Sequence, residues 1–200
     1  MVNMLEILGS YIIQFIQSTG YAGVFILMTL ESALIPIPSE VTMPFAGSLV
    51  ASGTFNFWLL ALVGAAANLT GSLLAYGLGY LGEGAVKKYG KYIFLREQEF
   101  EHAQKLFNKY GEAITFLSRI LPAIRTYISL PAGIAKMNLK KFILYTTLGS
   151  LIWSTFLTYL GVVLGANWHS LSGYFHKFDL IIVVVAALGL GVYLFKRFRR

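Results

Sequence analysis

Long apolar runs alternate with short polar breaks along the chain. Residues 41–82 contain no charged residue, and this stretch is about twice as long as the ~20 residues that one helical membrane crossing needs. Apolar runs of full crossing length lie at 57–82 and 139–168, and another at 178–196 ends in a basic tail. The pattern predicts an all-α polytopic membrane protein with one membrane domain over residues 1–200.

Two further apolar segments, 21–56 and 113–138, are interrupted by prolines and charges that do not suit a lipid-facing helix. Each segment therefore either leaves the membrane or forms a re-entrant helical hairpin that other parts of the protein shield. We expect hairpins in both places, shaped by small or rigid residues at their turns and contacts. These residues are Pro36, Pro38 and Gly47 in the first segment, and Pro122, Pro131 and Gly133 in the second.

The remaining segments are less apolar. Residues 1–20 predict an N-terminal helix, and the sequence leaves open whether this helix spans the membrane or lies on it. Residues 83–112 have the composition of a soluble protein, with apolar residues at helical spacing. They predict an amphipathic segment on the cytoplasmic membrane surface.

Composition supports the assignment to the membrane. The residues AVILMFWYC make up 56% of the chain and charged residues 12%, against about 25% charged residues in soluble domains. The net charge of +7 would suggest nucleic acid in a soluble protein. Here it is better explained by basic cytoplasmic loops that fix topology. We expect no nucleic-acid partner.

Candidate metal and cofactor ligands are scarce. The chain has no cysteine, and its three histidines are scattered, without the spacing of metal ligands on one helix face. We therefore expect no metal site and no cofactor.

The two broken segments resemble each other at a nearly constant separation. Ala46-Gly47 corresponds to Ala132-Gly133, Phe57 to Phe142, and Gly64 to Gly149. The basic residues orient the two halves oppositely, which predicts an inverted-topology repeat of the kind that places a site between facing halves. Chance similarity in a chain rich in Gly and Ala is the alternative.

Four charges fall within the broken segments: Glu31, Glu40, Arg119 and Arg125. Each would cost about 2.5–3.5 kcal/mol at the bilayer centre if it were unpaired. Two buried ion pairs that lock the hairpins together are one explanation, and a functional site is the other. Arginine binds phosphate through a planar fork, so we expect Arg119 and Arg125 to bind a lipid phosphate. Glu31 and Glu40 would pair with them and exchange protons.

Each half of the chain carries a set of spaced motifs. The first half has Glu31-x4-Pro36-x-Pro38-Ser39-Glu40 and Gly71-x4-Tyr76-x2-Gly79. The second half has Phe116-x2-Arg119-x2-Pro122-x2-Arg125 and Ala132-Gly133-x3-Met137. In these motifs the chain resembles the DedA family of membrane proteins. The resemblance implies that the same four charged residues are functional. It also implies transport that depends on the proton-motive force.

On this resemblance the leading hypothesis is a non-enzymatic flippase that moves undecaprenyl phosphate across the bacterial cytoplasmic membrane, for recycling of the carrier lipid. The alternative within the family is a flippase or scramblase of phospholipids such as phosphatidylethanolamine. An intramembrane phosphatase or protease is a third hypothesis, and the sequence lacks the paired histidines or the aspartate-bearing helices that it would need. The expected partners are a lipid phosphate, protons and the membrane, and homo-oligomerisation stays open.

Overall fold

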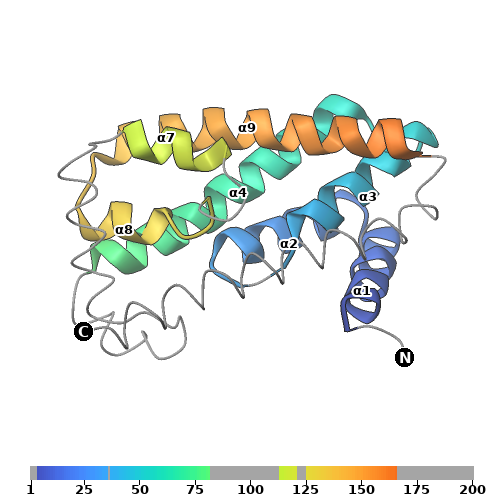
Figure 1. Ribbon diagram of the computed structural model, residues 1–200, viewed down its shortest axis with the longest axis horizontal. Coiled ribbons are helices and arrows are strands. Elements are labelled where there is room, and N and C mark those ends of the chain that lie inside the picture. The colour runs from blue at the N-terminus through green and yellow to red at the C-terminus, as the bar shows by residue number, and fades with distance from the viewer. Residues whose placement is uncertain (1–3, 36, 82–112, 121–124, 166–200) are drawn as a thin grey trace, which may run out of the picture. The chain divides into compact units, whose positions relative to one another are not determined.

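The computed structural model describes residues 4–35, 37–81, 113–120 and 125–165, and in these ranges it contains helices and no strand (Figure 1). The predicted all-helical fold is confirmed for this part of the chain. The predicted cytoplasmic segment 83–112 and the C-terminal crossing at 178–196 lie outside the described residues. The helices are α1 (Met4–Thr19), α2 (Tyr21–Ser32), α3 (Ser39–Ala51), α4 (Phe57–Tyr80), α7 (Ala113–Ile120), α8 (Ser129–Ile134) and α9 (Leu139–Leu164).

Two helices, α4 and α9, are long and apolar enough to cross a membrane. Each begins at an asparagine that caps its free N–H groups. The Asn56 side chain accepts from the N–H of Leu59, and the Asn138 side chain accepts from the first residues of α9. Asparagine is among the best N-cap residues because its short side chain reaches these donors. The ends of α4 and α9 thus lie within a few residues of the ranges 57–82 and 139–168, and that these helices cross the membrane stays a prediction.

The first broken segment forms two helices, α2 and α3. Helix α2 ends in a Schellman motif, in which the N–H of Ile35 bonds to the carbonyl of Leu30 and Leu34 takes a left-handed φ of 75°. Pro38 then occupies the N-cap of α3. The chain breaks where the prolines predicted a break. That these arms form a re-entrant hairpin in a membrane stays a prediction.

The second broken segment supplies α7 and α8. Residues 121–124, which include Pro122, lie outside the described residues. Helix α8 ends in a Schellman motif with Lys136 in the left-handed region, at φ 50°. Helix α3 ends in the same motif with Gly53 at φ 79°. In both halves an asparagine cap and a long helix then follow within a few residues.

Helix packing follows a reciprocal pattern. The first arm of each half packs on the long helix of its own half, so that α2 lies on α4 and α7 lies on α9. The second arm packs on the long helix of the other half, so that α3 lies on α9 and α8 lies on α4. This exchange is what two related halves with a common interface produce, and it supports the internal repeat.

Two glycines permit the second arms to approach so closely. A Cβ atom at Gly47 in α3 would collide with backbone atoms of Thr158 and Gly161 in α9. A Cβ atom at Gly133 in α8 would collide with the backbone of α4 at Tyr76. Small residues allow helix backbones to pack tightly in membranes, where van der Waals contact and not the hydrophobic effect drives association.

The long helices α4 and α9 pack against each other in antiparallel orientation (Figure 1). A Cβ atom at Gly64 in α4 would meet the hydroxyl of Ser154 in α9. Two turns further along α4, Ser72 lies near Thr146 of α9, since both hydroxyls bond to Arg119. These two points fix the register of the α4–α9 contact and place a polar strip along it.

Candidate functional site

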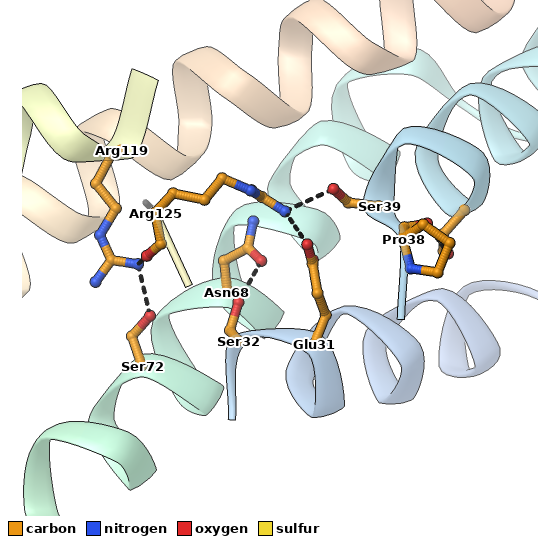
Figure 2. A network of polar contacts seen from close by, with 9 residues as sticks. Glu31, Ser32, Pro38, Ser39, Asn68, Ser72, Arg119 and Arg125 are labelled. Carbon is orange, nitrogen blue, oxygen red and sulfur yellow. Dashed lines mark hydrogen bonds and ion pairs between the residues drawn. The ribbon is translucent and has the colours of Figure 1, made fainter. Parts of the chain in front are cut away.

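The Arg125 side chain connects the two halves of the chain. It is 4% exposed, and its Nη2 atom donates to Glu31 Oε1 at 2.5 Å and to Ser39 Oγ at 2.7 Å (Figure 2). Arg125 precedes α8, whereas Glu31 lies in the last turn of α2 and Ser39 in the first turn of α3. The contact therefore holds both arms of the first half to the second half through one guanidinium group.

Arg119, in the last turn of α7, has a different environment. It is 3% exposed, and neutral oxygens surround it. Its Nη1 atom donates to Ser72 Oγ at 2.9 Å and to the carbonyl of Arg125 at 3.0 Å. Its Nη2 atom donates to Ser129 Oγ at 2.8 Å and to Thr146 Oγ1 at 3.2 Å. These oxygens hold the guanidinium in place without neutralising its charge.

The predicted meeting of four charges is therefore wrong in part. Among the residues that the structure describes, the one ion pair is Glu31–Arg125. Glu40 is exposed in the first turn of α3, where the positive end of the helix dipole favours a carboxylate. Arg119 does not need a carboxylate to hold it, because hydroxyl groups from three helices accept from it.

Aromatic rings cover both guanidinium groups. The Arg119 guanidinium lies 5.7 Å from the ring centroid of Phe142, and the Arg125 guanidinium lies 5.3 Å from that of Trp153. Both distances are within the range of cation–π attraction. Trp153 therefore lies against the Glu31–Arg125 ion pair.

Several buried polar atoms near these groups have no hydrogen-bond partner. Four of them are N–H donors: Asn68 Nδ2, Arg119 Nε, Arg125 Nε and Trp153 Nε1. The second carboxylate oxygen of Glu31, Oε2, is also without a partner. A buried polar group without a partner costs about 1–3 kcal/mol. Around the two arginines, the unpaired N–H donors thus outnumber the unpaired carboxylate oxygen.

The predicted hairpin-shaping residues lie at the ends and contacts of the arms. Pro38 caps α3 and Pro131 lies inside α8, while Pro36 and Pro122 lie outside the described residues. Gly47 and Gly133 lie at the two close helix contacts described above. None of the four described residues, Pro38, Pro131, Gly47 and Gly133, is hydrogen-bonded to the polar centre.

The sequence analysis did not select the hydroxyl partners of the two arginines as site residues. These partners are Ser39, Ser72, Ser129 and Thr146. The signal that could have found one of them is a hydroxyl residue at every fourth position of α9, all of them buried: Thr146, Ser150, Ser154 and Thr158. Such a strip on one helix face marks a polar contact inside an apolar protein.

Metal ligands do not gather in the described part of the chain. Among these residues no group of three or more His, Cys, Asp or Glu side chains could hold a metal ion. The chemistry of the centre described here rests on arginine, carboxylate, amide and hydroxyl groups.

Comparison with known proteins identifies the family of the chain. The VTT domain matches residues 37–163, which run from just before α3 into the last turn of α9. The chain belongs to the VTT-domain, or DedA, family. A relative named Protein DedA, from Escherichia coli, is 26% identical over 151 residues, with 72% of this chain and 68% of the relative covered. No solved structure matches the chain.

Other relatives of this DedA-family protein cover nearly its whole length. Undecaprenyl phosphate transporter A of Bacillus subtilis is 31% identical over 185 residues, which are 92% of this chain and 91% of the relative. A protein of Lactococcus lactis subsp. cremoris named alkaline phosphatase-like protein is 36% identical over 197 residues, 94% of this chain and 92% of the relative. The family and these relatives support a bacterial membrane protein of lipid transport.

Proposed function

We propose that this protein carries undecaprenyl phosphate across the bacterial cytoplasmic membrane in a proton-coupled cycle. The observation that carries the proposal is the imbalance of the buried centre. Two guanidinium groups face one buried carboxylate, and four N–H donors there lack an acceptor. An anion with several oxygens is the ligand that this centre needs.

A phosphate group meets this need in charge and in shape. A phosphate monoester carries about −1.5 to −2 charges near neutral pH, which would balance Arg119 and weaken the hold of Glu31 on Arg125. The planar guanidinium fork binds phosphate oxygens in pairs. The lipid tail stays in the bilayer while only the head group enters the protein.

The relatives support the choice of lipid. Two proteins named undecaprenyl phosphate transporter A, from Bacillus subtilis and Staphylococcus aureus, are each 31% identical to this chain over most of its length. Their printed names state a prenyl phosphate as the cargo. We carry this cargo over to the present chain as part of the proposal.

The proposed cycle begins with the ion pair. The phosphate displaces the Glu31 carboxylate from Arg125, and the freed carboxylate takes up a proton. Glu40, exposed at the start of α3, exchanges protons with the surroundings. The two hairpins then move against the long helices, and loss of the proton from Glu31 restores the ion pair and expels the lipid.

Transport in proteoliposomes tests the proposal. The flux of undecaprenyl phosphate is compared with that of phosphatidylethanolamine, with and without an imposed pH gradient, in wild type and Arg119→Ala. We expect selective, gradient-dependent movement of the prenyl phosphate that Arg119→Ala abolishes. Equal movement of both lipids without a gradient would contradict the proposal and indicate a scramblase. Release of inorganic phosphate would instead indicate a phosphatase.

A further inference from the structure

Asn68, in the middle of α4, is a buried amide whose oxygen is hydrogen-bonded and whose nitrogen is not. The residue is 1% exposed, and its Oδ1 atom accepts from Ser32 Oγ at 2.7 Å. Its Nδ2 atom, which carries two N–H groups, has no partner. The hydrogen bond to Ser32 joins α4 to α2 through the amide oxygen alone. It does not account for the unpaired amide nitrogen, which calls for another explanation.

The helix register places Asn68 between the groups that hold the two arginines. One turn further along α4, Ser72 accepts from Arg119. Across the contact with α2, Ser32 is the chain neighbour of Glu31, which binds Arg125. In Figure 2 the amide nitrogen of Asn68 points away from Ser32, toward the side on which Arg125 lies.

The side of α9 that packs against this part of α4 is also polar. Gly64 lies against Ser154 of α9, and Ser72 and Thr146 share Arg119. Asn68, one turn from each of these points on α4, therefore faces α9 at the level of Ser150. The Ser154 hydroxyl has no partner, just as the Asn68 amide nitrogen has none. Unpaired groups on both helices indicate a place where a polar ligand atom is accommodated.

We propose that Asn68 is a specificity residue that recognises the third free oxygen of a phosphate monoester. The inference rests on the function proposed above. A monoester has three oxygens that are not bonded to carbon, and a diester has two. Arg119 and Arg125 provide donors for two of them, and the Asn68 amide donates to the third. Ser32 is a positioning residue that turns the amide nitrogen toward the ligand.

The test measures binding to the full chain in detergent with two matched probes, dodecyl phosphate and dodecyl methyl phosphate. They differ in whether the third oxygen is free. At pH 5 each carries close to one negative charge, because the second pKa of a phosphate monoester is near 6. Trp153 reports binding, since its ring lies against Arg125. Trp58→Phe and Trp168→Phe leave it as the sole tryptophan among the chain's three.

We expect wild type to bind the monoester more tightly than the diester. Asn68→Ala should reduce this preference about tenfold by weakening the monoester alone, as the loss of one hydrogen bond to a charged group predicts. Ser32→Ala keeps the amide and should reduce the preference about threefold, which is less than the loss of a whole hydrogen bond to a charged group. Thr70→Ala, at an exposed position of the same helix, should change nothing.

If Asn68→Ala lowers the affinity for both probes equally, or for neither, the inference is overturned and Asn68 is a helix-packing residue. If Asn68→Ala does not fold, Ser32→Ala decides, and an unchanged preference in that variant overturns the inference. A wild-type chain that prefers the monoester while the variants behave like wild type leaves the proposed function standing. A wild-type chain that binds neither probe would overturn the proposed function and the inference together.

Discussion

The two halves of the chain share a scaffold and differ in charge. In each half the first arm packs on the half's own long helix and the second arm on the other long helix. The first half contributes Glu31 and Glu40, and the second half contributes Arg119 and Arg125. The polar centre therefore exists only where the halves meet. The two halves repeat the same helix packing, and the polar centre depends on the opposite charges that they contribute.

Removing the cation that joins the halves should have the largest effect. In Arg125→Ala, Glu31 is left buried without a partner, which should lower stability by about 3–5 kcal/mol. Transport should fall about 100-fold or more, because charge-assisted hydrogen bonds to the phosphate are lost. Thermal unfolding in detergent and flux in proteoliposomes measure the two effects.

The double variant Arg125→Ala/Glu31→Gln separates stability from function. It removes the unpaired charge, so the unfolding temperature should return toward that of wild type. Transport should stay lost, because the phosphate still lacks the guanidinium group. A double variant that transports normally would show that the ion pair only holds the halves together.

Arg119 allows a test of whether the site needs a planar guanidinium group or only a positive charge. Arg119→Lys keeps the charge but cannot reach Ser72, Ser129 and Thr146 together, because an ammonium group is a point donor. We expect transport to fall about tenfold, with the chain still folded. Phosphate binding measured by Trp153 fluorescence should weaken in parallel, and unchanged binding would remove Arg119 from the site.

The repeated scaffold predicts equal effects at equivalent close contacts. Gly47→Ala and Gly133→Ala should each lower stability by about 1–3 kcal/mol, because the added Cβ meets backbone atoms of the facing long helix. Gly77→Ala is the matched control, since a Cβ there meets nothing within 4 Å. This control should raise stability by up to about 1 kcal/mol. Unequal losses at Gly47 and Gly133 would speak against the repeat.

The smallest predicted effect lies at the ends of the second arms. Helix α3 ends with Gly53 in the left-handed region, and α8 ends with Lys136 there. Lys136→Gly should stabilise the chain by about 0.5–1 kcal/mol, and Gly53→Lys should destabilise it by about 1 kcal/mol. Chemical denaturation of both variants measures the difference. The same sign for both would contradict the equivalence of the two motifs.

The sequence predicts the helices well because each signal is local. Charge-free runs locate α4 and α9, and the proline-rich turn separates α2 from α3. The internal repeat is visible because each half needs the same glycine at its closest helix contact. Glu31, Arg119 and Arg125 can be identified from the sequence because so few charges interrupt the apolar segments.

The partners of these charges are set by helix register, which the sequence does not show. Serine and threonine occur throughout the apolar segments, and only the packing of α4 on α9 selects Ser72 and Thr146 as acceptors for Arg119. Glu40 was expected in the buried centre, but the start of α3 leaves it exposed. The same packing leaves the Asn68 amide nitrogen without a partner, which the sequence does not show.

Binding of dodecyl phosphate to Glu31→Gln tests the central claim most directly. If phosphate and the Glu31 carboxylate compete for Arg125, removal of the carboxylate charge should tighten binding about tenfold, as the loss of a charge-assisted competitor predicts. Trp153 fluorescence gives the affinity in both proteins. Weaker binding in Glu31→Gln would mean that Glu31 only positions Arg125, and the exchange of carboxylate for phosphate would be contradicted.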